Sequence, residues 1–437
     1  MSKRGNSSPD VPRKKDKTTH PFFAASTKPV VGSMTWRVEG DGALLVGEYL
    51  VQQPIDKIAA FDFDGTVTLS GGSHVFSKSS SDWRFVHPTN TKAKLLQLHE
   101  DGFRIVIISN QKGLLEESKK KAAKSETKEE IFKGKVAYVA GSLGIPLLVL
   151  AALDDGHFRK PQTGMWEYLI NHCNNNIAPD LTKSFYVGDA AGRPDRIERG
   201  KHVKKDHSAG DLRLALNLGI QFHIPETFYD IDPTAAQHIP AKWDFDPLSY
   251  SSASVELFTP SSKPLIPEDL EGPELVLLVG PPASGKTSFT STHFLTKGYI
   301  HVNQDTLKDR KKCLEVTRTS LQSGKSVIVD NTNPSAAIRK EYLSVAAAAG
   351  VTHVRCFYFT APMDLCLHNN HVRAKLTKGL GKGLERGRIP TMVFHTFNKN
   401  LEVPDAEKEG FVEVKRIQFV AQFKDEEEKA VWSKWYI

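Results

Sequence analysis

The chain has 437 residues, so two or three domains are expected, and its 39% of hydrophobic residues is enough for each domain to bury a core. No apolar run approaches the ~20 residues that a membrane-spanning helix needs, and the four cysteines form no CxxC pair, which argues against a zinc site and favours reduced thiols. The formal charge of +7 permits a polyanionic partner without demanding one.

The N-terminal segment, residues 1–32, has the composition of a disordered basic tail. It lacks the apolar core of a secretory signal. Its basic run consists of Arg13, Lys14, Lys15 and Lys17. Such a run is typical of a nuclear import signal, of an arm that binds nucleic acid, or of a merely solvated tail, and the sequence leaves these three interpretations open.

Residues 33–244 predict a first α/β domain, because strand patterns alternate with helix patterns. The predicted elements are a hairpin formed by 33–38 and 43–49, strands at 57–61, 103–111, 146–153 and 183–192, and helices at 91–100 and 128–143. This order predicts a mainly parallel sheet with helices on both faces. Ligands of such sheets bind at the carboxyl ends of the strands, where each of these strands ends in polar residues.

The stretch 245–273 is rich in Ser and Pro and has little apolar periodicity, so it is interpreted as a linker. Residues 274–437 predict a second α/β domain. Its first strand, ELVLLVG, begins at Glu274, and further strands are expected at 326–329 and 352–359 with an Ala-rich helix between them. No internal repeat relates the two halves.

Two carboxylates, Asp62 and Asp64, follow the first strand of the parallel sheet in the motif FDFDGT. Side chains alternate along a strand, so residues two apart face the same cleft. One Asp can then attack phosphorus while the other gives a proton to the leaving oxygen. Gly65 allows a tight turn that Thr66 is expected to hold by hydrogen bonding. The alternative is an Asx turn after a buried strand.

The later strands of this domain end in Ser109, in the segment of Lys160, and in Asp189. The order Asp, Ser/Thr, Lys, Asp resembles that of the haloacid-dehalogenase phosphatases. Mg²⁺ held by Asp62, Asp189 and the backbone carbonyl of Asp64 would offset the repulsion between two anions. Ser109 and Lys160 would hold the phosphoryl oxygens. A Lys before Pro is otherwise usually plain surface.

The second domain opens with GPPASGKT, which fits GxxxxGK[ST] between a strand and a helix. The loop from Gly280 to Gly285 would cradle phosphates with its backbone N–H groups. Lys286 would reach the β- and γ-phosphates, and the Thr287 hydroxyl would bind Mg²⁺. ATP and Mg²⁺ are therefore the predicted cofactors.

Three later features of this domain bear on the acceptor. Asp305, in NQDT, is a candidate general base or only a helix N-cap. Asp330 ends a buried strand and would support Mg²⁺ or position the acceptor, unless it only caps a turn. Arg373 and the basic, Gly-rich segment 375–388 suit a lid that brings positive charge to the transferred phosphoryl group.

The motifs FDFDGT, SNQKG, RKPQTGMW, YVGDAAGRP, GPPASGKT, NQDTL and DNTNP occur in this order and resemble the polynucleotide kinase 3′-phosphatase family over roughly residues 33–420. The resemblance implies a haloacid-dehalogenase-like 3′-phosphatase domain followed by a P-loop 5′-kinase domain that act on DNA ends in the nucleus. It implies that Asp62 is the phosphorylated nucleophile, Asp64 the general acid/base and Asp189 a metal ligand. The kinase residues that it implies are Lys286, Thr287 and Asp305.

The sequence departs from the family pattern in three places. Animal members usually carry an N-terminal forkhead-associated domain that docks phosphorylated scaffold proteins, whereas here only the basic tail precedes the phosphatase motifs. The resemblance therefore does not extend to that docking, and the tail is a candidate for contacts with other repair proteins. Ser109 stands where Thr is common, which keeps the hydroxyl. His371 stands where Arg is often found, so the lid role is assigned to Arg373.

Two other function classes fit some of these features. One is a kinase/phosphatase of a free nucleotide or sugar, and the other is a binding scaffold without activity. The basic charge and Trp83 beside Arg84 favour a nucleic-acid end, because an aromatic ring can stack on a terminal base, although a core role suits Trp83 as well. The intact residues of both motif sets argue against a scaffold. The sequence leaves open DNA or RNA and single strand or duplex.

Overall fold

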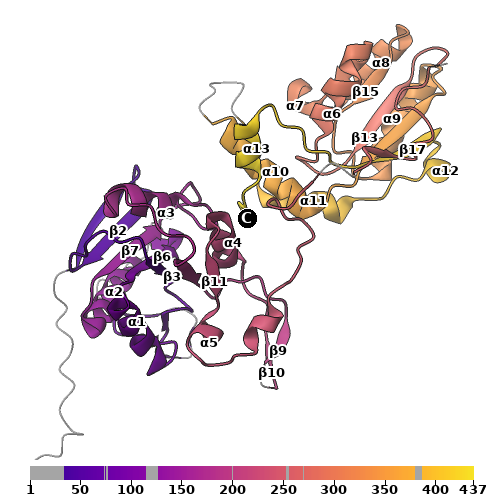
Figure 1. The fold of residues 1–437 in the computed structure, drawn as a ribbon. Coiled ribbons are helices and arrows are strands. Elements are labelled where there is room, and N and C mark those ends of the chain that lie inside the picture. Colours follow the sequence, from indigo (N-terminus) through magenta and orange to yellow (C-terminus); the bar gives the residue numbers. More distant parts are fainter. Residues whose placement is uncertain are drawn as a thin grey trace, which may run out of the picture.

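The computed structural model describes residues 34–437, except 73, 75–76, 115–125, 199, 252–254, 269 and 379–385. Two α/β domains follow each other along the chain (Figure 1). The predicted basic tail, residues 1–32, lies outside the described residues, so its structure and its partners stay predictions. Within the described part of the chain, every helix is too short or too polar to cross a lipid bilayer.

The first domain is built on a seven-stranded sheet in the order β1-β2-β7-β6-β3-β8-β11. Its strands are β1 (Thr35–Glu39), β2 (Leu44–Tyr49), β3 (Ile58–Phe61), β6 (Arg104–Asn110), β7 (Leu147–Ala152), β8 (Phe185–Val187) and β11 (Gln221–His223). The five strands from β7 to β11 run parallel, and the predicted hairpin β1–β2 pairs antiparallel at one edge. The prediction of a mainly parallel sheet is therefore confirmed.

Helices cover both faces of this sheet, as Figure 1 shows. They are α1 (Asn90–Glu100) and α2 (Lys128–Leu143) on one face, and α3 (Gly164–Tyr168) and α4 (Gly210–Leu218) on the other. Smaller elements are β4 (Thr68–Leu69), β5 (Arg84–Phe85), β9 (Arg196–Glu198), β10 (Lys201–Val203) and α5 (Pro225–Phe228). Two separate apolar clusters, one on each face, hold the layers together.

Helix α2 begins where the sequence supplies a capping box. The Thr127 side chain accepts from the Glu130 backbone N–H, and the Glu130 carboxylate accepts from the Thr127 N–H. The helix ends at Gly144, which has a left-handed backbone with φ 66°. Its apolar face packs Phe132 and Val136 onto the sheet, and Lys135 is buried on that same face.

The second domain has a six-stranded sheet in the order β12-β17-β16-β13-β15-β14, parallel except for β12. Its strands are β12 (Phe258–Thr259), β13 (Leu275–Val279), β14 (Ile300–Val302), β15 (Val327–Val329), β16 (Val354–Phe359) and β17 (Glu413–Ile417). Its helices are α6 (Lys286–His293), α7 (Gln304–Leu307), α8 (Arg310–Gln322), α9 (Ala336–Ala348), α10 (Met363–Leu376), α11 (Thr391–Asn400), α12 (Ala406–Glu409) and α13 (Glu426–Trp432).

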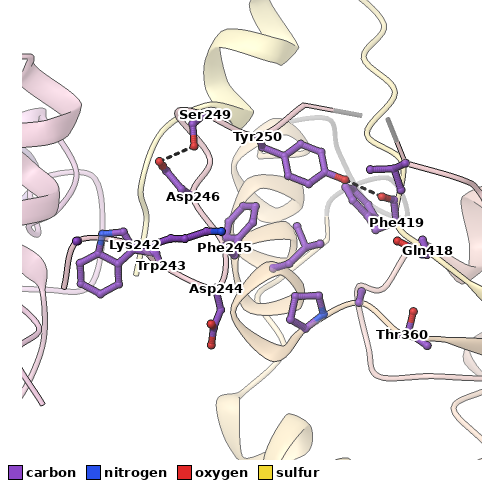
Figure 2. A pocket seen from close by; sticks show the side chains of 15 residues that line it. Lys242, Trp243, Asp244, Phe245, Asp246, Ser249, Tyr250, Thr360, Gln418 and Phe419 are labelled. Atoms are coloured by element: carbon purple, nitrogen blue, oxygen red, sulfur yellow. Dashed lines mark hydrogen bonds between the residues drawn. The ribbon is translucent and has the colours of Figure 1, made fainter. Parts of the chain in front are cut away.

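Much of the predicted linker, 245–273, packs on the second domain. β12 adds an antiparallel strand to β17, and the Tyr250 hydroxyl donates to the carbonyl of Phe419 over 2.6 Å (Figure 2). A pocket of about 460 Å³ lies between residues 241–250, Val255 and the segments that follow β16 and β17. None of the residues that line it belongs to a predicted site.

The C-terminus contacts the first domain at helix α4 (Figure 1). The Asn217 side chain donates to the carbonyl of Trp435 over 2.9 Å and accepts from the Trp435 N–H over 2.8 Å. The Arg213 guanidinium lies over the rings of Trp243 and Trp435, at 4.6 and 4.1 Å from their centroids. The domains therefore contact each other through residues outside both predicted sites.

Candidate active sites

The phosphatase residues predicted from the sequence meet at the carboxyl ends of β3, β6 and β8. The carboxylate oxygens of Asp62, Asp189 and Asp211 lie within 4.8 Å of one another. Asp62 directly follows β3, and Asp189 comes two residues after β8. Asp211, the second residue of α4, completes the group although nothing in the sequence pattern pointed to it.

Lys160 lies in the middle of this acidic cluster. Its Nζ is 2.6 Å from Asp62 Oδ1, 2.7 Å from Asp211 Oδ1 and 2.8 Å from the Tyr186 hydroxyl. Burial alone would lower the pKa of Lys160, but the charges of Asp211 and Asp62 outweigh it and raise the pKa. Burial, and then the charge of Asp211, raises the pKa of Asp62 to about 6, while Lys160 opposes the shift. The ammonium thus lies beside the predicted nucleophile, where a phosphoryl oxygen would be held.

The three carboxylates fit a hard divalent cation such as Mg²⁺. Burial, and then the charges of Asp62 and Asp211, raise the pKa of Asp189 well above its ordinary value. Crowded carboxylates of this kind are stabilised by a cation with oxygen ligands. Two glycines allow the crowding: a Cβ on Gly65, which has φ +85°, would lie 2.4 Å from Asp189 Oδ2, and a Cβ on Gly188 would lie 2.4 Å from Asp211 Cγ.

Asp64 lies apart from the cluster and points its carboxylate elsewhere. Lys135 Nζ donates to Asp64 Oδ1 over 2.7 Å, and Gln111 Nε2 donates to Asp64 Oδ2 over 2.8 Å. Gln111 also contacts Ser109 Oγ at 3.1 Å, so a polar chain joins the two predicted catalytic residues. The metal role predicted for Asp64 concerns its backbone carbonyl, and that role stays a prediction.

Sequence reasoning missed Asp211, Lys135 and Gln111. Asp211 is 22 residues beyond Asp189 and separated from it by the hairpin β9–β10, so no short motif reveals it. Lys135 carried a usable signal, because it interrupts the apolar stripe formed by Phe132, Val136 and Val139 on α2. A charged residue on a buried face needs a partner, and Asp64 is that partner.

The structure contradicts one expectation about this domain, for Thr66, and favours one of two interpretations of Trp83. The Thr66 hydroxyl is buried without a hydrogen-bond partner among the described residues, so the expectation that it holds the turn was wrong. Backbone bonds hold the turn instead, with the Gly65 N–H donating to the Thr68 carbonyl over 2.8 Å. Trp83 packs edge-on against Phe85 at 5.2 Å, beside the core, which favours its core role over stacking on a base.

In the second domain, the predicted phosphate-binding loop joins β13 to α6. Lys286 is the first residue of α6, and its Nζ donates to the carbonyls of Gly280 at 3.0 Å and Pro281 at 2.6 Å. Burial lowers the pKa of Lys286 to about 8. A buried cation beside the loop and the helix N-terminus suits the binding of nucleotide phosphates.

Thr287 and Asp330, both predicted to support Mg²⁺, contact each other directly. The Thr287 hydroxyl donates to Asp330 Oδ2 over 2.7 Å, and Asn303 Nδ2 and His301 Nε2 both lie 3.1 Å from the same oxygen. Burial alone would raise the pKa of Asp330, but hydrogen bonds from His301 and Thr287 outweigh it and lower the pKa. Asp330 thus links Thr287, next to the phosphate-binding loop, to His301 in β14. A residue that only capped a turn would not need these contacts.

Asp305 is exposed on α7, and the alternative that it is the N-cap of this helix was wrong. The N-cap is Asn303, whose side chain accepts from the Asp305 N–H over 2.8 Å. Burial lowers the pKa of Arg373 on α10, the charge of Arg386 adds to this shift, and the charge of Asp305 opposes it. Of the predicted lid, residues 379–385 lie outside the described residues. The assignments of Asp305 and Arg373 stay predictions.

Comparisons with known proteins agree with this geometry. The family model "Polynucleotide kinase 3 phosphatase" matches residues 57–229, and an "AAA domain" model matches residues 275–404. The first domain is thus a haloacid-dehalogenase-like phosphatase domain and the second is a P-loop kinase-like domain, which confirms the predicted fold class.

Three relatives illustrate the extent of the similarity. A bifunctional polynucleotide phosphatase/kinase of Schizosaccharomyces pombe is 33% identical over 395 residues, which cover 90% of this chain and 86% of the relative. A putative one of Acanthamoeba polyphaga mimivirus is 28% identical over 382 residues, 83% of this chain and 85% of the relative. A polynucleotide 3′-phosphatase of Saccharomyces cerevisiae is 27% identical over 216 residues, 39% of this chain and 87% of the relative. Two assembled sites and similarity along nearly the whole chain show that it belongs to the family of bifunctional polynucleotide phosphatase/kinases.

Proposed function

We propose that this enzyme repairs broken DNA ends in the nucleus, removing 3′-phosphates through an aspartyl-phosphate intermediate and adding phosphate from ATP to 5′-hydroxyls. The observation that carries the phosphatase part is the contrast between two carboxylates. Asp62 is buried against Lys160, whereas the Asp64 side chain is 53% exposed and held by Lys135. One carboxylate is therefore placed to attack phosphorus and the other to exchange protons at the mouth of the site.

The proposed phosphatase reaction has two steps. An Asp62 oxygen attacks the phosphorus of the 3′-phosphate, the bond to the 3′-oxygen breaks, and Asp64 gives that oxygen a proton. Asp64 then takes a proton from the water that attacks the aspartyl phosphate, which releases inorganic phosphate and regenerates Asp62. Lys160 and Ser109 hold the phosphoryl oxygens throughout. Mg²⁺ bound at the acidic cluster would reduce the repulsion between the two anions.

The proposed kinase reaction is a direct transfer. Lys286 and the loop N–H groups hold the ATP phosphates, while Thr287 and Asp330 would hold Mg²⁺. Asp305 takes the proton of the attacking 5′-hydroxyl, and Arg373 stabilises the charge on the transferred phosphoryl group. Thr287 and Asp330 both offer oxygen ligands, and the 2.7 Å between their side-chain oxygens supports the proposal that both hold the same Mg²⁺ ion.

Matched substrates test the choice of DNA. We expect kcat/KM for 3′-phosphate removal and for 5′-phosphorylation to be higher on DNA oligonucleotides than on free nucleotides by about 10²-fold or more, because contacts beyond the reacting group contribute to binding. End-labelled DNA and RNA of the same sequence, single-stranded and duplex, are compared with nucleoside monophosphates. Equal rates on free nucleotides would support a metabolic enzyme, and a preference for RNA would contradict the DNA assignment.

Lys135 is expected to act through Asp64, as a positioning residue. In Lys135→Met the side chain keeps its length and apolar burial but loses the ammonium. We expect kcat for 3′-phosphate release to fall by about 10–10²-fold with little change in KM, because a misplaced acid/base slows chemistry more than binding. Release from p-nitrophenyl phosphate, whose leaving group needs little protonation, should fall much less.

The matched control for this variant is Lys133→Met, which removes an ammonium from the same helix at a position where it pairs with Glu129 and lies over the Trp36 ring, away from Asp64. Phosphorylation of 5′-hydroxyl ends serves as an internal check on folding. Equal losses on both phosphatase substrates, or an unchanged kcat in folded Lys135→Met, would show that Lys135 does not position Asp64.

A further inference from the structure

The segment between Asp189 and Asp211 is a projecting hairpin. β9 and β10 pair antiparallel through a turn at Gly200, which has φ 75°, and they form a two-stranded ribbon separate from the main sheet (Figure 1). Both ends of the segment carry carboxylates of the acidic cluster. The hairpin is therefore inserted in the chain between two residues of the phosphatase site.

The base of the hairpin is bound firmly to the loop that carries Asp189. Asp206 accepts from the backbone N–H groups of Ala191 at 3.2 Å and Arg193 at 3.1 Å, and it pairs with the guanidinium groups of Arg193 at 2.8 Å and Arg196 at 3.3 Å. Arg193 also donates to the carbonyl of Asp189 over 3.1 Å. These arginines are neutralised and buried, so they hold the hairpin in place and are not free for a ligand.

The outer face of the hairpin differs from this base. The register pairs Ile197 with His202 on one face and Arg196 with Val203 on the other. Ile197 is 62% exposed, His202 is exposed, and Arg196 is only 8% exposed. Ile197 belongs to no hydrophobic cluster of the described residues. Three exposed lysines of this segment form no ion pair within the described part of the chain: Lys201, Lys204 and Lys205.

We infer that the hairpin β9–β10 binds the polynucleotide strand whose 3′ end enters the phosphatase site, an inference that rests on the proposed function. The lysines contact backbone phosphates, and Ile197 and His202 pack against a base or sugar. The hairpin lies in the chain between Asp189 and Asp211, and Arg193 at its base donates to the carbonyl of Asp189, so it begins and ends next to the site that the 3′-phosphate would enter. Exposed lysines on the same hairpin as an uncovered apolar side chain match a substrate that is a polyanion with apolar base faces. In the register Lys201 lies opposite Glu198, on the other face from Ile197.

The test replaces the three cations together, as Lys201→Ala, Lys204→Ala and Lys205→Ala in the full chain. We expect kcat/KM on a single-stranded 3′-phosphorylated oligonucleotide to fall by about tenfold or more at low salt. The plot of log(kcat/KM) against log[salt] should become shallower by about two, because each phosphate contact with a single strand contributes about 0.7 to the slope. Thymidine 3′-monophosphate has the same leaving group but no strand, so its turnover should be unchanged.

The matched control removes three exposed lysines from the second domain, through Lys297→Ala, Lys325→Ala and Lys340→Ala. This control lowers the net charge by the same amount as the hairpin variant, and it should leave the slope of log(kcat/KM) against log[salt] unchanged. A second variant, Ile197→Asp, should raise KM for the oligonucleotide and leave the mononucleotide unaffected.

An unchanged salt slope in the triple variant would overturn the inference, as would equal losses on the oligonucleotide and the mononucleotide. An acidic protein would then be the alternative partner of this face. Failure of the proposed function would be seen in the wild-type enzyme itself, which would then turn over the mononucleotide as fast as the oligonucleotide.

Discussion

Asp62→Asn is expected to lower kcat for 3′-phosphate release by about 10⁴-fold or more, because an amide cannot serve as the nucleophile that a carboxylate provides. Asparagine keeps the shape of the side chain and one oxygen for Lys160, so the buried cluster stays packed. Phosphorylation of 5′-hydroxyl ends should stay within about twofold of the original rate, since the two sites lie on separate sheets and share no residue. Both rates are measured on end-labelled oligonucleotides.

Two further measurements make this prediction specific. Lys286→Ala should have the reverse effect, with the kinase lost and the phosphatase kept. Single turnover of the wild-type enzyme in ¹⁸O-water should place the heavy oxygen in the released phosphate and none in Asp62, because water attacks the phosphorus of the aspartyl phosphate and Asp62 keeps both of its oxygens. Label in the Asp62 side chain would instead show attack on its acyl carbon.

 Acid quenching during turnover of a ³²P-labelled 3′-phosphate is the deciding measurement, because direct attack of water on the substrate would also place the heavy oxygen in phosphate. It should trap phosphate on the wild-type protein and none on Asp62→Asn. Loss of both activities from either substitution in a folded protein would contradict two independent sites.

Asp305→Asn is expected to slow 5′-phosphorylation by about 10²–10⁴-fold, the usual contribution of a general base. The affinity for ATP should change little, because the proposed site for the ATP phosphates is the loop around Lys286, which Asp305 does not belong to. Asn keeps the size of the side chain, and the cap of α7 is supplied by Asn303, so the substitution tests charge and not helix stability. Single-turnover rates on 5′-hydroxyl DNA and ATP binding by titration are the two measurements.

The neighbouring helix offers a matched control, because Asp309 is the N-cap of α8 and accepts from the Lys311 N–H over 3.1 Å. Asp309→Ala removes a cap, which costs about 1 kcal/mol of stability, and should leave the phosphorylation rate nearly unchanged. If Asp305→Asn phosphorylates ends at almost the original rate, the base lies elsewhere, and Asp330 is the next candidate.

Local patterns were enough to predict the main strands and helices. Continuous apolar runs bounded by polar residues predicted strands at 103–111 and 146–153, and the structure has them as β6 and β7 with nearly the same bounds. The helix expected at 128–143 is α2, whose capping box and terminal glycine are encoded within the helix and its flanks.

The strand β12 shows what local sequence patterns do not predict. It has only two residues, Phe258 and Thr259, inside a stretch that reads as a Ser/Pro-rich linker. Its partner β17 begins at Glu413, more than 150 residues later, so its strand conformation depends on pairing with a distant segment. No property of the local sequence reports such a partner.

The sequence by itself determined which residues end the strands, and therefore the motif around Asp62, proposed to hold the nucleophile, and the loop around Lys286, proposed to bind phosphate. Each is a short motif next to a strand, and the carboxyl ends of parallel strands bring such motifs to one edge of a sheet. Only the tertiary structure decided that Asp211 joins the acidic cluster and that Lys135 holds Asp64. Those contacts depend on how helices pack across the sheet, because the residues are far apart in the chain and meet only when the layers assemble.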